Sequence, residues 1–234
     1  VIHGVAGSGK TLILAYRCEF LARTLSKPIL VLVYNKALAA WLAHQVAARG
    51  LADRVSVRTF HGWCLDQLAL YHVPKPVSEG QSFYKDLVAT VIRAVDSGQI
   101  PRAQYGALLI DEGHDFEPDW LRLVVQMLDP ESNSLLLLYD DAQSIYGANR
   151  PKSFTFRSVG ISAPGRTKIL KRNYRNTDEI LACASAFARE ILSPKEADED
   201  GVPLVSPEPG GRKGLRPRFC ETRSAREEAV TIRQ

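Results

Sequence analysis

A glycine-rich segment at the beginning of the chain has the residue types and the spacing of a loop that binds phosphate. Its residues are Gly4, Val5, Ala6, Gly7, Ser8, Gly9, Lys10 and Thr11. Glycines let the backbone turn so tightly that successive N–H groups point at one anion, and a helix that starts here adds partial positive charge. The Lys10 ammonium can reach the outer phosphates of a nucleoside triphosphate, while the Thr11 hydroxyl can bind Mg²⁺. The segment therefore predicts a nucleotide site that uses Mg²⁺.

Two adjacent acidic residues, Asp111 and Glu112, follow the apolar run 107–110. Open α/β sheets bind their ligands outside the carboxyl ends of the strands, which is where these residues would lie. We expect Asp111 to hold Mg²⁺ through its water shell and Glu112 to orient or deprotonate the attacking water. Together with the glycine-rich loop, this pair predicts a nucleotide hydrolase. A kinase, an AAA-type ATPase or a transporter subunit would share both motifs.

Short apolar runs alternate with helical patterns along the chain, and they would position these groups. Predicted strands cover residues 29–33, 55–57, 107–110, 135–138 and 167–170, and predicted helices cover 37–48, 81–95 and 120–128. Uninterrupted apolar runs are typical of strands that are buried on both faces. The alternation predicts an α/β fold in which βα units build a parallel sheet with helices on both faces.

The composition is typical of a soluble globular protein of 234 residues, with 45% apolar and 24% charged residues. No apolar run reaches the roughly 18 residues that a membrane helix needs, so no membrane partner is predicted. The net charge of +4 permits a polyanionic partner without arguing for one. The cysteines show no CxxC spacing, which disfavours a zinc site, and their scatter fits a reducing cytoplasm. They are Cys18, Cys64, Cys183 and Cys220.

Four further segments occur in the order found in superfamily 1 helicases of the UvrD/Rep type, and the chain resembles that family. They are Thr59-Phe60-His61, Asp111-Glu112-Gly113-His114-Asp115, Asp140-Asp141-Ala142-Gln143-Ser144-Ile145-Tyr146 and Asn173-Tyr174-Arg175-Asn176. The third of these is the most specific. The resemblance extends from Gly4 to about Leu192. It implies a RecA-like P-loop NTPase fold, with ATP as the nucleotide and single-stranded DNA as the partner.

The resemblance also implies roles for individual residues. Gln143 would sense the γ-phosphate and link it to the DNA side, and Tyr174 would stack on adenine. Arg175 would reach the γ-phosphate as an arginine finger from a second RecA-like domain. The residues that would contact DNA are Asn35, Lys36, Thr59, Phe60, His61 and Tyr146. Two other interpretations stay open, because Tyr174 can be a packing residue of the core and His61 can start a helix without binding a ligand.

Three departures from the family pattern indicate a reduced and divergent branch. Leu12 stands where UvrD and Rep carry an arginine that helps to hold adenine. Ala148 stands where the family has an aromatic residue that stacks on a DNA base, and residues 65–106 are far shorter than the inserted subdomain of UvrD. These departures keep open a second hypothesis, a helicase-like ATP switch that binds a nucleic acid or a protein without unwinding. A phosphotransferase is disfavoured by the adjacent acids 111–112 and by the string 143–146.

We therefore predict a RecA-like ATP-binding domain over residues 1–150, with a reduced helical insert at 65–106. Residues 151–234 are predicted to be the incomplete start of a second RecA-like domain, because the pattern weakens into glycine, proline and serine near 147–165. The chain starts inside a strand and lacks the later motifs of the family, so we interpret it as a fragment that alone would hydrolyse ATP poorly. The predicted activity is that of a cytoplasmic ATP-dependent DNA helicase or translocase that moves 3′ to 5′ on single-stranded DNA.

Overall fold

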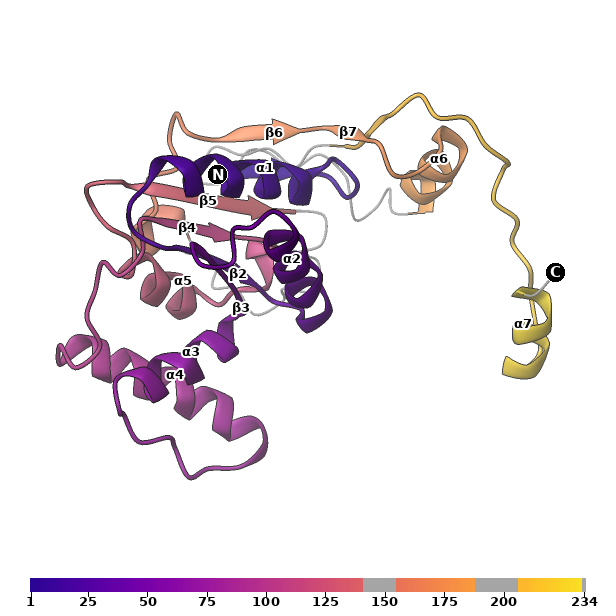
Figure 1. The fold of residues 1–234 in the computed structure, drawn as a ribbon. Helices are drawn as coiled ribbons and strands as arrows, with labels where there is room; N and C mark the ends of the chain where they lie inside the picture. The colour runs from indigo at the N-terminus through magenta and orange to yellow at the C-terminus, as the bar shows by residue number, and fades with distance from the viewer. Residues whose placement is uncertain (141–154, 188–205, 233–234) are drawn as a thin grey trace.

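The computed structural model describes residues 1–140, 155–187 and 206–232. Its centre is a six-stranded sheet with the strand order β3-β2-β4-β5-β1-β6 and with helices on both faces (Figure 1). The strands are β1 (Ile2–Gly4), β2 (Ile29–Val33), β3 (Val55–Thr59), β4 (Ala107–Ile110), β5 (Ser134–Tyr139) and β6 (Lys168–Leu170). Each pairing that joins these strands is parallel, so their carboxyl ends meet at one edge. The predicted α/β class is confirmed, and the arrangement is that of a RecA-like P-loop NTPase.

Helices cover both faces of this sheet, and β2 shows why. The helices that pack on it are α1 (Lys10–Thr24), α2 (Lys36–Ala48), α3 (Phe60–Leu70), α4 (Gly80–Asp96) and α5 (Pro118–Val125). The helices α6 (Asp178–Phe187) and α7 (Ala225–Ile232) follow later in the chain. Leu30 and Leu32 of β2 pack with residues of α3, α4 and α5. The alternate residues Ile29, Val31 and Val33 pack with α1 and α2, because successive side chains of a strand point to opposite faces. A strand that is covered on both faces has no solvated position, which explains its uninterrupted apolar run.

Side chains at two strand ends cap the helices that follow. Asn35 Oδ1 accepts hydrogen bonds from Ala37 N at 2.7 Å and from Leu38 N at 3.4 Å at the start of α2. Thr59 Oγ1 accepts one from Gly62 N at 3.2 Å at the start of α3. Caps of this kind satisfy N–H groups that the first turn of a helix leaves unpaired. Because β2 and β3 are neighbours in the sheet, these two turns lie beside each other at its carboxyl edge.

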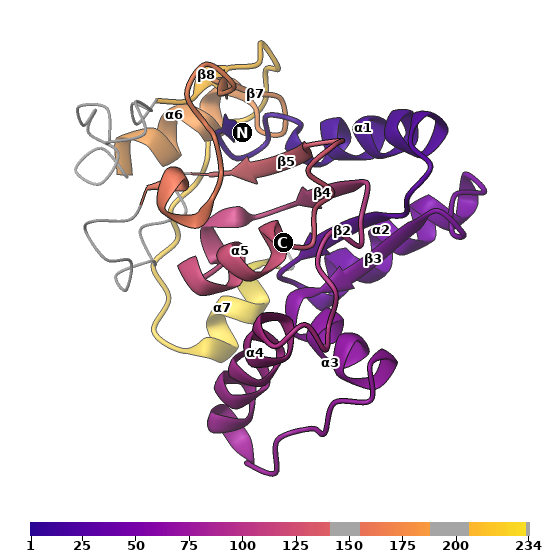
Figure 2. The same ribbon diagram turned by 90° about the vertical axis from the view of Figure 1, so that its left-hand side faces the viewer.

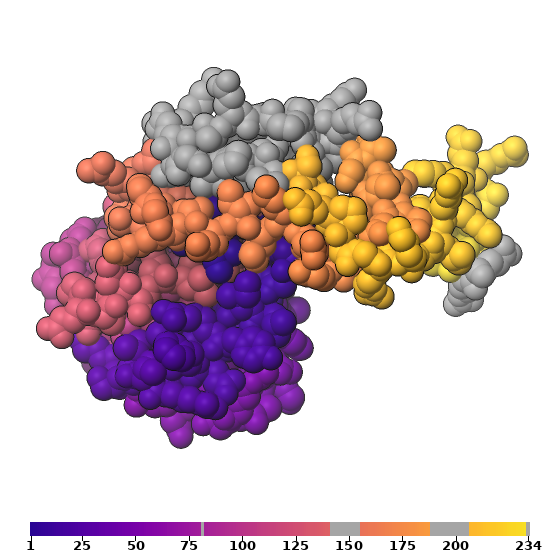
Figure 3. Space-filling model, turned by 90° about the horizontal axis from the view of Figure 1, so that it is seen from above, coloured from indigo at the N-terminus to yellow at the C-terminus, as the bar shows by residue number. Residues whose placement is uncertain are grey.

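The sheet continues past the domain boundary that the sequence predicts after residue 150. β6 pairs with β1, and Phe156, Val159 and Ile161 are buried in the core cluster that includes α5. In Figure 3 the orange segment that contains β6 and β7 lies along the indigo N-terminal segment. The glycine, proline and serine residues of 147–165 indicate a linker, but the apolar residues between them pack on the first sheet. That sheet therefore extends to Leu170, and the predicted boundary does not coincide with its end.

The chain leaves this sheet after β6. The strand β7 (Arg172–Asn173) pairs in parallel with β8 (Glu208–Pro209) in a second, two-stranded sheet. The residues after β8 are held against α6 by an ion pair of 2.9 Å between Lys213 and Asp178 and by a hydrogen bond of 2.8 Å from Gly214 N to Glu179. Among the helices that the structure describes, none is long and apolar enough to cross a membrane.

The four cysteines are free thiols in different environments. Cys18 of α1 and Cys64 of α3 are buried where their helices pack on the sheet, each on a different face, whereas Cys220 is exposed. Burial raises the pKa of Cys18 to about 11 and also raises the pKa of Cys64, because the thiolate loses its hydration. Both buried thiols are therefore expected to be chemically inert in the folded protein.

We expect iodoacetamide at about pH 8 to alkylate Cys220 rapidly and to leave Cys18 and Cys64 unmodified, because the reaction needs an accessible thiolate. Mass spectrometry of the digested protein measures the extent at each site. The same reaction in guanidinium chloride, where all four thiols are accessible, is the control. Fast labelling of Cys64 in the native protein would show that α3 does not pack on the sheet as described.

Candidate nucleotide-binding site

The glycine-rich segment forms a tight loop between β1 and α1. Gly7 and Gly9 have φ angles of 73° and 91°, a left-handed backbone conformation that glycine adopts without a steric penalty. Ser8 N donates to Val5 O at 3.1 Å and closes the turn. The loop lines a pocket of about 300 Å³, which is within the range of small-molecule sites. Its other lining residues are Leu12, Glu112, Tyr174 and Arg175.

Lys10, the first residue of α1, makes a buried ion pair with Asp140. Its Nζ lies 3.1 Å from Asp140 Oδ2 and donates to Gly4 O at 2.7 Å. Only 8% of the lysine side chain and 1% of the aspartate side chain are exposed. Each charge therefore depends on the other, because an unpaired charge in the interior is strongly destabilising. Asp140 directly follows β5, the neighbour of β1 in the sheet. Sequence analysis includes this aspartate in the segment 140–146 but assigns it no role of its own.

Thr11 and Asp111 bring oxygen atoms together at the bottom of the loop. Thr11 Oγ1 donates to Asp111 Oδ2 at 3.1 Å, and Glu112 N donates to Asp111 Oδ1 at 3.0 Å. Burial raises the pKa of Asp111, and these hydrogen bonds together with the charge of Lys10 lower it in part. Oxygen ligands are what Mg²⁺ prefers, and it keeps several waters and takes its remaining ligands from phosphates.

The groups around Thr11 and Asp111 fit a metal ion that enters the pocket together with a nucleotide. Within the described ranges, no group of three or more histidine, cysteine, aspartate or glutamate residues could hold a metal ion. The donor set of Thr11 and Asp111 is therefore sufficient only when phosphate and water oxygens complete it. This is the usual way in which nucleotide-hydrolysing sites hold Mg²⁺.

Glu112 has a strained backbone and a carboxylate oxygen that is buried. Its φ angle of 52° lies in the left-handed region, which is costly for a residue other than glycine. Its Oε2 is buried and has no hydrogen-bond partner among the described residues. Burial, followed by the charge of Asp111, raises the pKa of Glu112 to about 6. A buried acceptor at the wall of the pocket can bind a water molecule, which a general base requires.

His114 connects the acidic motif to the end of β5. Its Nδ1 accepts a hydrogen bond from Asp140 N at 3.4 Å and lies 3.7 Å from Glu112 Oε2. The ring is buried and makes an edge contact with Tyr139 at a centroid distance of 5.8 Å. These contacts place His114 between Glu112 and Asp140, away from the mouth of the pocket.

The segment Asn173-Tyr174-Arg175 is attached to the glycine-rich loop. Tyr174 N donates to Gly7 O at 2.9 Å, and Val5 N donates to Leu170 O at 3.0 Å. The buried Asn173 Oδ1 accepts from Arg175 N at 3.0 Å and from Asn176 N at 2.9 Å, which fixes the turn between them. The side chain of Tyr174 is 56% exposed, so the alternative of a core position is excluded. Sequence analysis places Arg175 on a separate domain, whereas here its backbone segment lies directly on the loop.

A second hollow, which we call the α4 groove, lies at the carboxyl ends of β2 and β3. It has a volume of about 790 Å³ and is lined by residues of α4, α5 and the starts of α2 and α3. Figure 2 shows how these helices are arranged. The predicted DNA contacts Lys36, Thr59 and His61 all line it. Burial lowers the pKa of His61, so this ring is neutral at pH 7 and can donate or accept hydrogen bonds without carrying charge. Tyr84 and Lys85 of α4 also line the groove, and sequence analysis did not single them out.

The other predicted DNA contacts have different positions. Phe60 is 1% exposed and stacks on Trp120 with a centroid distance of 4.5 Å and an interplanar angle of 13°. Its predicted contact with DNA is therefore wrong, because the ring belongs to the core. Asn35 is exposed beside Lys36, with its Oδ1 engaged in the helix cap. Gln143 and Tyr146 lie outside the described residues.

The packing of the arginine segment on the loop can be tested by comparing two glycines. A Cβ on Gly7 would lie 2.7 Å from Arg175 Cβ and 2.9 Å from Asn173 Oδ1, whereas a Cβ on Gly9 would meet nothing within 4 Å. Both Gly7→Ala and Gly9→Ala introduce left-handed strain of about 1–2 kcal/mol. We expect Gly7→Ala to lose about 1–3 kcal/mol more from the clash, as measured by urea unfolding without nucleotide. Equal losses in the two variants would show that the segment does not pack on the loop.

Comparison with known families agrees with this geometry. A family model described as an AAA domain (AAA_19) matches residues 1–149, which are 149 of the 234 residues. No curated protein matches the chain. The matched region contains the glycine-rich loop, the acidic pair 111–112 and Asp140, whereas Tyr174 and Arg175, which also line the pocket, follow it in the sequence. The chain belongs to this AAA-domain family, and its matched region is an ATP-binding P-loop NTPase domain of the helicase type.

Proposed function

We propose that the chain is the ATP-hydrolysing part of a motor that moves 3′ to 5′ along single-stranded DNA. The observation that supports this most is the position of the two hollows at one edge of the sheet. The nucleotide pocket lies at the ends of β1, β4 and β5, and the α4 groove lies at the ends of β2 and β3. β2 pairs with both β3 and β4, so a displacement of either site is passed to the other through adjacent strands.

In this proposal each pocket residue has a separate role in ATP hydrolysis. The backbone N–H groups of the loop and the ammonium of Lys10 bind the outer phosphates, and Thr11 and Asp111 hold Mg²⁺. A Mg²⁺ ion bound there would neutralise negative charge on the phosphates. Glu112 orients the attacking water and accepts its proton. The ion pair with Asp140 already holds the Lys10 ammonium beside the loop, so little side-chain entropy is lost when a nucleotide binds.

Three further roles follow from the helicase resemblance. Tyr174 stacks on adenine, since its exposed ring lies at the mouth of the pocket. Arg175 and Gln143 contact the γ-phosphate, and both respond to its loss after hydrolysis. We place the start of a second RecA-like domain after Leu170, where the chain leaves the first sheet. Lys36, Thr59 and His61 contact the DNA backbone in the α4 groove.

A second candidate function is an ATP switch that binds single-stranded DNA or a protein without separating strands. The observation that favours it is the small size of the insert between β3 and β4, whose helices in the structure are α3 and α4. A strand-displacement assay on a duplex with a 3′ single-stranded tail separates the two candidates. Efficient displacement that requires ATP identifies the motor, whereas DNA-stimulated ATP hydrolysis without displacement identifies the switch.

Removal of Lys10 is expected to have two separable effects. Lys10→Ala should abolish ATP hydrolysis, and it should also lower the free energy of unfolding by about 3–5 kcal/mol because the buried Asp140 carboxylate loses its ion-pair partner. The double variant Lys10→Ala/Asp140→Asn should recover much of the lost stability and remain inactive. Thermal unfolding and phosphate release measure the two effects. An active Lys10→Ala enzyme would contradict the assignment of the pocket.

Single-stranded DNA is expected to stimulate ATP hydrolysis by the full-length protein, because both sites share the carboxyl edge of the sheet. Lys36→Ala should raise the concentration of oligonucleotide needed for half-maximal stimulation, since one phosphate contact is lost. Steady-state phosphate release with increasing oligothymidylate measures this concentration. Hydrolysis that is indifferent to DNA at low salt would refute the motor, and the family membership would then indicate ancestry only.

A further inference from the structure

Tyr84 is a large aromatic side chain on the wall of the α4 groove that packing does not account for. It is 49% exposed, although the same helix buries Leu87, Val88 and Val91 in the core. Its neighbour Lys85 is also exposed and also lines the groove. The first turns of α4 therefore present a ring and an ammonium group to the hollow, while later turns supply the core.

The ring of Tyr84 is held in position by a series of aromatic contacts. Tyr84 meets His61 edge-on at a centroid distance of 4.8 Å, and His61 meets Trp120 at the same distance. Trp120 stacks on Phe60, which is buried in the core. The chain of four rings connects a half-exposed ring to the rigid interior, so Tyr84 loses little freedom when a flat ligand stacks on it.

The charges around the groove favour an anionic ligand. Lys36 and Lys85 both line it, and within the described part of the chain neither makes an ion pair with an acid. Of the two acids at the rim, Asp119 is paired with Arg122, which leaves Glu117 as the opposing charge. Two lysines beside a half-exposed aromatic ring form the combination that binds a single nucleic-acid strand, since phosphates meet ammonium groups and unpaired bases stack on rings.

We propose that Tyr84 stacks on an unpaired base of single-stranded DNA in the α4 groove and that Lys85 contacts an adjacent phosphate. The inference rests on the proposed function, and it adds a DNA contact from the insert helix α4. A duplex does not fit this arrangement, because its bases already stack on one another. The ring would supply the base contact that the sequence lacks at Ala148.

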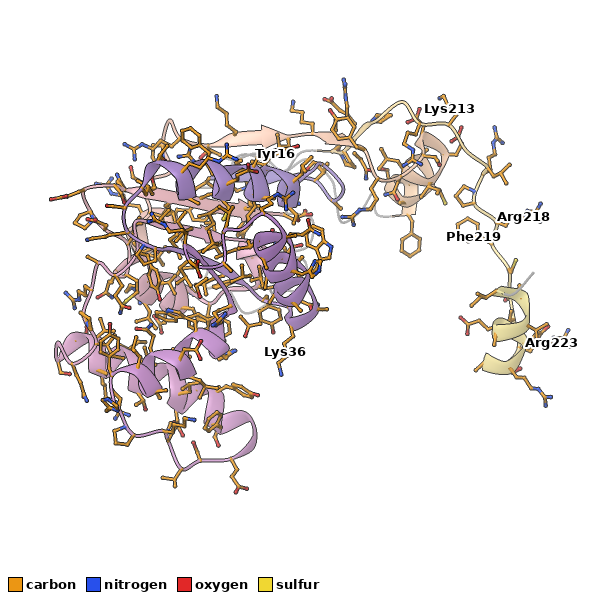
Figure 4. All side chains as sticks on the ribbon, viewed as in Figure 1. Tyr16, Lys36, Lys213, Arg218, Phe219 and Arg223 are labelled. Carbon is orange, nitrogen blue, oxygen red and sulfur yellow. The ribbon has the colours of Figure 1, made fainter. Side chains whose placement is uncertain are left out.

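The binding test uses the full-length protein and a fluorescent oligothymidylate, with anisotropy as the readout. Tyr84→Ala should weaken binding by about 5- to 100-fold, the effect of losing one stacked base. Tyr84→Phe keeps the ring and should bind about as tightly as wild type. Lys85→Gln should reduce the slope of log affinity against log salt by about 1. The matched control is Tyr16→Ala, which removes an exposed ring of α1 that does not line the groove (Figure 4).

A second readout locates the contact directly. Irradiation of a complex with 5-iodouracil-substituted DNA should crosslink Tyr84, which is identified by mass spectrometry of the digest. Crosslinking needs a stacked ring, so it distinguishes a contact from an indirect structural effect. Thermal unfolding of Tyr84→Ala should match wild type within about 1 kcal/mol, because the ring is half exposed.

The outcomes separate this inference from the function on which it rests. If Lys36→Ala weakens DNA binding and Tyr84→Ala does not, the inference fails and the motor stands. If wild type neither binds oligothymidylate nor responds to it in hydrolysis, both fail. Tighter binding of oligouridylate than of oligothymidylate, with the same dependence on Tyr84, would overturn DNA as the ligand.

Discussion

Parallel pairing in the central sheet is the constraint on which both candidate sites depend. Parallel strands need crossover connections, so the strands end at the same edge, where β1, β2 and β3 each turn into a helix. The strand order then decides which turns become neighbours. Because β5 lies between β4 and β1, Asp111 meets Thr11 and Asp140 meets Lys10, although the partners are 100 and 130 positions apart in the sequence.

The electrostatics of the nucleotide pocket are unbalanced in the chain by itself. Three acids, Asp111, Glu112 and Asp140, lie around the ammonium of Lys10, and Arg175 is the other basic residue that lines the pocket among the described residues. Burial raises the pKa values of both Asp111 and Glu112, and the charge of Asp111 also raises that of Glu112, which means that each resists ionisation where it stands. A divalent cation that enters with a nucleotide adds the missing positive charge. The pocket is thus better suited to a metal–nucleotide complex than to a free anion.

The sequence predicts what is encoded locally and misses what depends on strand order. The glycine-rich loop and the acidic pair are short, specific patterns, and the parallel sheet follows from the alternation of apolar runs and helices. The ion pair between Lys10 and Asp140 joins residues that are 130 positions apart, so no local pattern reports it. Phe60 and Tyr84 show the same limit, since only packing makes the first a core residue and the second an exposed ring. The sequence also does not show that β6 lies beside β1, because the glycine, proline and serine residues before it indicate a linker between domains.

Two backbone hydrogen bonds, Val5 N to Leu170 O and Tyr174 N to Gly7 O, join the residues on either side of β7 to the phosphate loop. Because the two hydrogen bonds lie close together, they prevent a translation of this segment away from the loop. The residues that follow Asn173 therefore leave the phosphate loop from a fixed position, whatever their arrangement further along the chain.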